Sequence, residues 1–491
     1  MEIRMKRNDV FFLLICLGLG VLAELSFFHG RIGVSYLVFI TGFYAVLFGK
    51  YRLSFNNRRI GLLLMIGIWM LAGTYAFYDN VLFRNLNVLL IPVLVFFHIV
   101  LITSSNNINW SKPSFVVFLF EKLEQGLRYS SRFCKISFRK VFKNMNDQTA
   151  QTIKRVFVGL LIGIPLLMVI TGLLMSADSV FQDLVLRLPE FVLELNFLEG
   201  AFRSILVVLF TLFFFGIFQV LQVRTKPKDS FGPIKEKSIR RWDSITAVTI
   251  LILLNAVYVL FAVIQFKYFF NDGLQSGFTY AEYARRGFFE LIFVTLINWS
   301  ILISFLKLVQ DDRRSMKITL KVMYSLLVAV SGVMLTSAYQ RLSLYEAAYG
   351  FTLDRVLAHA FMIFLMVIFA YTFIRVLLER LSILHFYLIV GLVFYTGLNV
   401  ISLEKIVVNN NLERYEETGK IDIYYLSHLS YAGIDGLMDL YEADPDYPEL
   451  RQLLVKHHQR LSNEMNNSWQ SFNLMKQKVT DRLEKLDLSH E

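Results

Sequence analysis

The sequence lacks most of what a soluble enzyme is built from. Only 18% of its 491 residues are charged, against about a quarter in soluble domains. Its two cysteines, Cys16 and Cys134, exclude a disulfide framework, and no Cys/His spacing suits a metal ion. It contains no P-loop, H-E-x-x-H, G-x-S-x-G or kinase signature. We therefore expect no catalytic residues, no cofactor and no metal site.

Apolar residues are abundant instead. The mean hydropathy is +0.51, and 46 residues are phenylalanine. Several apolar runs have the roughly 17–25 residues that a membrane-spanning helix needs. The sequence predicts an all-α, polytopic transmembrane helix bundle with a helical, extracytoplasmic C-terminal tail. The eleven expected spans are Val10–Phe28, Gly33–Phe48, Ile60–Tyr78, Asn87–Thr103, Val156–Met175, Ser204–Leu221, Ser244–Phe270, Phe288–Leu308, Ile318–Ala338, Leu357–Ile374 and Ile383–Val400.

Basic residues alternate along these spans. Of the 50 Lys and Arg residues, 31 fall in the N-terminus and in every second connection. Because basic connections stay on the cytoplasmic side, this bias places the N-terminus inside and the tail from Ser402 outside. The formal net charge of +11 is thus a topology signal and does not indicate nucleic-acid binding. The first span lacks a cleavage site and is expected to remain in the protein.

Two segments outside the spans are expected to be helical. Phe115–Leu127 and Tyr129–Asn144 interleave apolar and basic residues, which predicts amphipathic helices on anionic lipid at 115–144, or a docking surface for a cytoplasmic partner. In the tail, a pair of short helices and then one long helix from Glu449 to Leu486 are expected. The expected units are 1–103 (spans), 104–155 (basic loop), 156–243 (spans with an acidic outer loop), 244–401 (core transmembrane domain) and 402–491 (tail).

Polar residues converge in three segments that the charge bias places on the outer face. They are Phe278–Leu291, Tyr339–Ala358 and Asn409–Tyr415. Several arginines with few compensating acids favour an anionic group such as phosphate or carboxylate, and tyrosines suit a sugar or headgroup. The equal alternative is that these residues pair with one another and lock the outer ends of the helices. The candidate ligand-binding residues are Tyr280, Glu282, Tyr283, Arg285, Arg286, Glu290, Arg341, Tyr345, Glu346, Tyr349, Arg355 and Arg414.

Polar residues within the spans are sparse. Asn255 and Asn298 are expected to form hydrogen bonds between helices, together with Tyr258 and Gln265. His98 and His359 are expected to be core or interface residues. No charged residue lies near the middle of a span, which disfavours an ion-coupled carrier.

Three ordered motifs carry a family resemblance. They are T-Y-A-E-Y-A-R-R-G-F-F-E-L (Thr279–Leu291), R-L-S-L-Y-E-A-A-Y-G-F-T-L-D-R (Arg341–Arg355) and N-L-E-R-Y-E-E-T-G-K-I-D-I-Y-Y-L-S-H-L (Asn411–Leu429). With them the sequence resembles a bacterial family of polytopic membrane proteins of unknown function, over about Ile245–Glu442. The resemblance implies a bacterial cytoplasmic membrane and supplies no activity.

The leading functional expectation is a non-enzymatic membrane protein whose outer polar cluster binds an envelope component or a membrane partner. A transporter or flippase for an anionic or lipid-linked solute is the alternative. An enzyme that modifies envelope lipid or glycan is third. A carrier needs a polar path across the membrane and an enzyme needs a pocket around a reacting atom, whereas a binding protein needs neither.

The expected topology has a direct test. With the N-terminus inside and an odd number of spans, a cysteine introduced at Ser468 should react with a membrane-impermeant thiol reagent in intact cells. If it reacts only after the membrane is opened, the span count is wrong by one.

Overall fold

The computed structural model describes residues 7–51, 56–104, 110–141, 170–178, 195–222, 242–270, 288–309, 313–463 and 468–486, with isolated positions elsewhere. Every regular element in these ranges is a helix, which confirms the all-α prediction. Ten of the described helices are long and apolar enough to cross a membrane. Within the expected span Val156–Met175, residues 170–175 and several separate positions are described and are helical, and the others lie outside the described residues.

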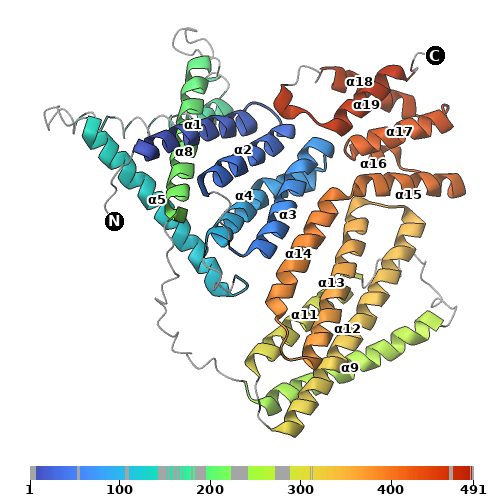
Figure 1. Cartoon of the computed structure of the whole chain (residues 1–491). Coiled ribbons are helices and arrows are strands. Elements are labelled where there is room, and N and C mark those ends of the chain that lie inside the picture. The colour runs from blue at the N-terminus through green and yellow to red at the C-terminus, as the bar shows by residue number, and fades with distance from the viewer. Residues whose placement is uncertain are drawn as a thin grey trace.

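The first half of the bundle is packed around phenylalanines. Phe12, Phe43, Phe215 and Phe218 are buried in one apolar cluster. All the helices of this half, which are drawn in blue to green in Figure 1, contribute to that cluster. The basic helix α5 crosses α8 and buries Phe115, Phe118 and Phe133 in the same cluster. The helices of this half are α1 (Arg7–Phe28), α2 (Val34–Tyr51), α3 (Arg58–Phe77), α4 (Val81–Thr103), α5 (Pro113–Val141) and α8 (Leu195–Gln222).

The second half has a separate apolar cluster, formed by its first four helices. Two amides join these helices as the sequence predicted: Asn255 donates to the carbonyl oxygen of Met323 at 3.1 Å, and Asn298 donates to Ser331 at 3.0 Å. The helices of this half are α9 (Ser244–Phe270), α11 (Phe288–Leu308), α12 (Arg314–Tyr349), α13 (Leu353–Leu377) and α14 (Ile383–Val400).

Helix α14 connects the two halves. It follows α13 in the chain but packs against α3 of the first half. The Asn87 amide of α4 donates to the Asn399 oxygen at 2.7 Å, and the Tyr395 hydroxyl donates to the Asn87 oxygen at 2.7 Å. Asn87 and Asn399 are buried, so this three-residue link satisfies polar groups that would otherwise be stranded among apolar side chains.

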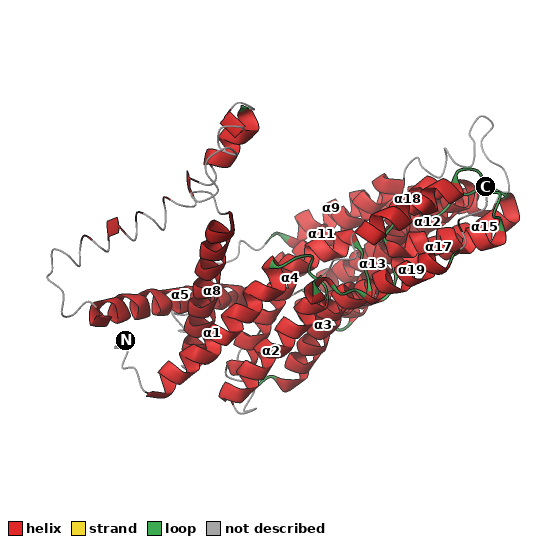
Figure 2. Ribbon diagram, turned by 90° about the horizontal axis from the view of Figure 1, so that it is seen from above, coloured by secondary structure: helices red, strands yellow, loops and turns green. Residues whose placement is uncertain are grey.

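The C-terminal residues form a helical unit with its own apolar core, which we call the tail module. It sits across the ends of both halves, and in the view from above its helices overlie α12 and α13 (Figure 2). We call this end of the bundle the tail end and the opposite end the basic end. The module comprises α15 (Leu403–Thr418), α16 (Ile423–His428), α17 (Tyr431–Ala443), α18 (Leu450–Asn463), a short 3-10 helix (Trp469–Ser471) and α19 (Leu474–Lys485).

Backbone hydrogen bonds fasten the tail module to the first half. The Val34 N–H donates to the Phe472 carbonyl oxygen at 3.0 Å, at the turn between α1 and α2. The Asn473 amide donates to the carbonyl oxygens of Tyr75 and Tyr78 at 3.0 and 2.9 Å, at the turn between α3 and α4. The turns that the charge bias assigned to one side of the membrane therefore lie together at the tail end.

Several expected boundaries were wrong. Helix α12 continues for 36 residues through Tyr349, a length of about 54 Å that exceeds the roughly 30 Å hydrocarbon core of a bilayer, whereas the expected span ended at Ala338. Helix α8 begins nine residues before Ser204. The two expected amphipathic helices are the single helix α5. The expected long helix Glu449–Leu486 is divided into α18, the 3-10 helix and α19, and three short helices precede it rather than two.

The link between the halves predicts coupled stability. Asn87→Leu should lower the free energy of unfolding in detergent by about 1–2 kcal/mol, because the partners of Asn87 lose their hydrogen bonds without exposure to water. Asn87→Leu with Asn399→Leu should cost clearly less than the sum of the single changes. Leu89→Ala is the matched control on α4, because Leu89 is 74% exposed. Strict additivity of the two asparagine changes would contradict the link.

Candidate functional site

Two of the three expected polar segments meet at the tail end. The last turns of α12 carry Arg341, Tyr345 and Glu346, and the first turn of α13 carries Arg355. Arg414 of α15, in the tail module, reaches the last turn of α12. We call these five residues the arginine cluster. Its members come from segments about 70 residues apart in the chain, so the tail module assembles it.

Two arginines of the cluster bind the end of a helix. Arg414 donates to the carbonyl oxygens of Ala348 at 2.9 Å and Ala347 at 3.3 Å, in the last turn of α12. Arg355 donates to the Gly350 carbonyl oxygen and lies 4.3 Å from the centre of the Tyr345 ring. The final carbonyls of a helix lack partners within the helix and carry partial negative charge, so guanidinium groups stabilise them. For Arg355 and Arg414, the locking of helix ends is what the structure shows.

Gly350 makes the sharp turn between α12 and α13. Its φ of 83° and ψ of 175° fall in a region that is essentially restricted to glycine. Asn411 of α15 holds the next residue by accepting from the Phe351 N–H at 3.0 Å and donating to the Phe351 carbonyl oxygen at 2.8 Å. A Cβ at Gly350 would lie 2.8 Å from the Asn411 Oδ1, so the turn and the tail module fit only with glycine here.

The acid of the cluster, Glu346, is buried and pairs with a histidine of α13. The Glu346 carboxylate is 3.2 Å from the His359 Nδ1. The His359 ring stacks on Tyr339 with 4.4 Å between ring centres. His359 is therefore an interface residue, as expected, and so is His98, which is buried 2.7 Å from the Tyr44 hydroxyl.

Two other expected site residues are exposed, and the rest lie outside the described residues. Tyr349 is 58% exposed at the end of α12, and Glu290 is exposed in the first turn of α11. The remaining candidates, Tyr280, Glu282, Tyr283, Arg285 and Arg286, lie outside the described residues.

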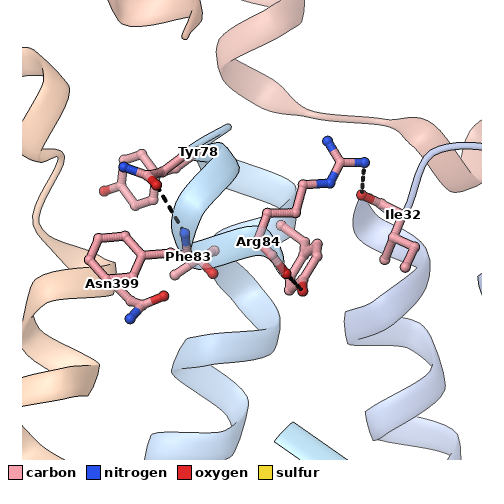
Figure 3. A pocket seen from close by; sticks show the side chains of 8 residues that line it. Ile32, Tyr78, Phe83, Arg84 and Asn399 are labelled. Atoms are coloured by element: carbon pink, nitrogen blue, oxygen red, sulfur yellow. Dashed lines mark hydrogen bonds between the residues drawn. The ribbon is translucent and has the colours of Figure 1, made fainter. Parts of the chain in front are cut away.

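A second polar site, which the sequence did not indicate, lies where the turn between α3 and α4 meets the end of α14 (Figure 3). Arg84 donates to Asp79 at 2.9 Å and to the Ile32 carbonyl oxygen at 3.1 Å. Asn80 caps α4 by accepting from the Phe83 N–H at 3.0 Å. These groups surround a pocket of about 20 Å³ that also includes Asn399, which is room for one water molecule.

Two carboxyl groups beside this pocket have raised pKa values. Burial raises the pKa of Asp79, although Arg84 opposes the shift. Burial also raises the pKa of Glu404, which begins α15, against the stabilising effect of its own backbone N–H and the Asn80 side chain. The Asp79 charge raises the pKa of Glu404 slightly further. The pocket thus lies at a contact between the bundle and the tail module where burial favours the neutral form of both carboxyl groups.

A third polar group links α1 to α8 at the tail end. The buried Glu24 carboxylate lies 3.3 Å from the His29 ring and 3.8 Å from Arg203. The sequence pattern did not indicate Glu24 or Asp79 as site residues, because each is a single acid near the end of an expected span. The sequence Asp79-Asn80 just before the apolar residues of α4 was the available signal, since Asp and Asn are typical N-cap residues.

No group of three or more His, Cys, Asp or Glu side chains among the described residues is placed to hold a metal ion. The arginine cluster and the pocket are instead networks of paired side chains at helix ends. Ten apolar helices, amides paired between them and a helical module across one end define an integral membrane protein built as a polytopic helix bundle.

The family follows from the sequence comparison. Residues 65–440 match DUF4153, a domain of unknown function, and the chain belongs to this family. The match starts within α3 and ends within α17, so the expected resemblance over Ile245–Glu442 began too late in the chain. No curated protein and no solved structure matches the chain.

The glycine turn gives a sharp stability prediction. Gly350→Ala should lower the free energy of unfolding by about 1–3 kcal/mol, because the required backbone region is strained for any other residue. Gly332→Ala, in the same helix, is the matched control, since nothing lies within 4 Å of a Cβ there. Thermal unfolding of the purified proteins in detergent measures both. Equal effects of the two changes would show that the turn carries no strain.

The pKa of Glu404 predicts a pH dependence. Because the folded protein holds this proton more tightly than the unfolded chain, the contribution of Glu404 to stability is greatest below its usual pKa of 4.5. That contribution is lost as the pH rises through the raised value. The stability advantage of Glu404→Gln over the wild type should therefore increase from pH 4.5 to pH 8. A difference that does not change with pH would mean that Glu404 is charged throughout this window.

Proposed function

We propose that this protein resides in a bacterial cytoplasmic membrane and binds an envelope component or a membrane partner at its tail end. In this proposal the N-terminus is cytoplasmic and the tail module extracytoplasmic, as the bias of the basic residues favours. The observation that carries the proposal is the tail module itself. It is a folded unit with its own apolar core, it lies beyond the ends of the spans, and it assembles polar side chains from distant segments.

The helix-end contacts narrow the choice of binding residues. Arg355 and Arg414 bind backbone carbonyls at the end of α12. We propose that Arg285 and Arg286 bind the anionic group, with Glu282 and Tyr283 orienting them. Residues 280–287 directly precede α11, whose last residues pair with the start of α9 at the basic end, so α11 begins at the tail end. The guanidinium fork binds phosphate or carboxylate at two points, which fits an anionic envelope group.

A second proposal concerns α5 and the opposite membrane face. This helix carries six basic residues and two acidic ones, and its buried phenylalanines pack into the core of the first half. We propose that its basic residues bind anionic headgroups of the cytoplasmic leaflet, since each well-placed basic residue contributes about 1 kcal/mol.

The alternative function, a transporter or flippase for an anionic or lipid-linked solute, is favoured by one observation, an apolar cavity inside the first half.

The tail-end proposal is tested by separating protein amount from activity. Arg285→Ala and Arg286→Ala should leave the amount of folded protein in the membrane unchanged but fail to restore the phenotype of a deletion strain. Arg286→Lys should restore it only in part, because an ammonium group lacks the planar fork. Arg414→Ala should lower the protein amount, because two carbonyls of α12 lose their donor.

Arg414→Ala therefore serves as the control for a structural defect. Both quantities are measured on the same strains, by immunoblot of membranes and by complementation. If the phenotype of Arg285→Ala and Arg286→Ala follows the protein amount as it does for Arg414→Ala, these arginines are structural and the binding proposal fails.

A further inference from the structure

The first half of the bundle contains a large apolar cavity. It lies between α1, α2, α4, α5 and α8 and has a volume of about 620 Å³. Buried side chains of three different helices, Phe39, Ile91 and Phe214, form part of its wall. Cavities that bind small molecules in proteins measure about 300–1,000 Å³, so this one is large enough for a ligand.

The lining excludes water. Tyr36 is the single residue with a polar side chain among those that line the cavity. A buried water molecule needs about two to four polar partners, which this wall does not provide. An empty space of this size would forfeit the dispersion contacts of every side chain around it. A hydrocarbon is the occupant that satisfies both conditions.

The shape favours an extended chain. The cavity runs along α4 from Ile91 to Ile99 and along α8 from Phe210 to Phe218, about 12 Å in each case at 1.5 Å per residue. Its long axis is therefore parallel to the helices, as are the acyl chains of a bilayer. Val93 of α4 and Phe120 of α5 line it and are 61% and 68% exposed, so the cavity opens sideways between these two helices.

The exposed positive charge of α5 lies further along the same helix. Helix α5 contributes Leu119 and Leu123 to the lining, and Lys122 between them is buried. The exposed basic residues are Arg128, Arg132 and Lys135, and the helix as a whole carries six basic and two acidic residues. A lipid whose chain enters between α4 and α5 thus has a helix of net positive charge beside it for its headgroup. We infer that the cavity binds one acyl chain of an anionic phospholipid, with the headgroup against α5.

The experiment uses the full chain reconstituted in phosphatidylcholine vesicles that contain a small fraction of phosphatidylglycerol with a diazirine near the end of one acyl chain. After illumination, labelled residues are mapped by mass spectrometry. We expect labels on Phe39, Ile91 and Phe214, because these buried residues are reached from the cavity and not from the surrounding lipid. Phosphatidylcholine that carries the same diazirine should label them several-fold less.

Two substitutions on α4 provide a matched pair. Val93→Trp narrows the opening and should lower labelling of the buried residues several-fold. Leu89→Trp adds the same side chain one turn earlier, at a lipid-exposed residue outside the lining, and should not. If Val93→Trp does not fold, Phe213→Trp, which narrows the same cavity from α8, replaces it.

Three results would overturn the inference. Equal labelling in both tryptophan variants would indicate surrounding lipid only. Labels confined to exposed residues such as Phe120 would indicate that the protein chain itself fills the cavity. Equal labelling by the two lipids would remove the role of the headgroup. None of these results bears on the tail-end binding proposal, which concerns other residues and the opposite end of the bundle.

Discussion

The fold depends on a polar contact between two apolar bundles. Each half has its own core, and two apolar bundles in a bilayer gain little from association, because lipid solvates their surfaces as well as another helix does. The link of Asn87, Tyr395 and Asn399 supplies what apolar surface lacks, a preferred partner and a fixed register. Helix α14 carries this link and continues directly into α15. The position of the tail module therefore follows from the way the halves join.

The tail module then holds the helix ends in place. Asn473 binds the turn between α3 and α4, and Asn411 and Arg414 bind the turn between α12 and α13. Each contact is made by a side chain of the module to backbone atoms of the bundle. Such contacts depend on the path of the backbone rather than on the residues in the turns, with the exception of Gly350, where a side chain does not fit. The module thus stabilises both halves.

The two proposed binding regions differ in chemistry as well as in position. At the tail end, charged and aromatic side chains gather beyond the spans, where water lets an arginine exchange one anionic partner for another. In the first half, phenylalanines enclose a space that water does not fill, and the basic helix α5 lies at its opening. The two proposed regions together are compatible with a binding protein or with a protein that handles lipid. The buried amides Asn87, Asn255 and Asn298 of the described spans bond to neighbouring helices.

The sequence by itself determined the class of fold, most of the long apolar helices, and the fact that Asn255 and Asn298 form hydrogen bonds between helices. These features are local, because hydropathy and helix length are read within about twenty residues. It did not reveal that α12 continues to Tyr349, that the helix expected from Glu449 is broken, or that Asp79 and Glu404 lie together. Only the tertiary structure decided these, and whether an arginine faces a ligand or a helix end. The partners of Arg414 lie 66 and 67 residues away in the chain, and no local pattern encodes a contact between a side chain and so distant a carbonyl group.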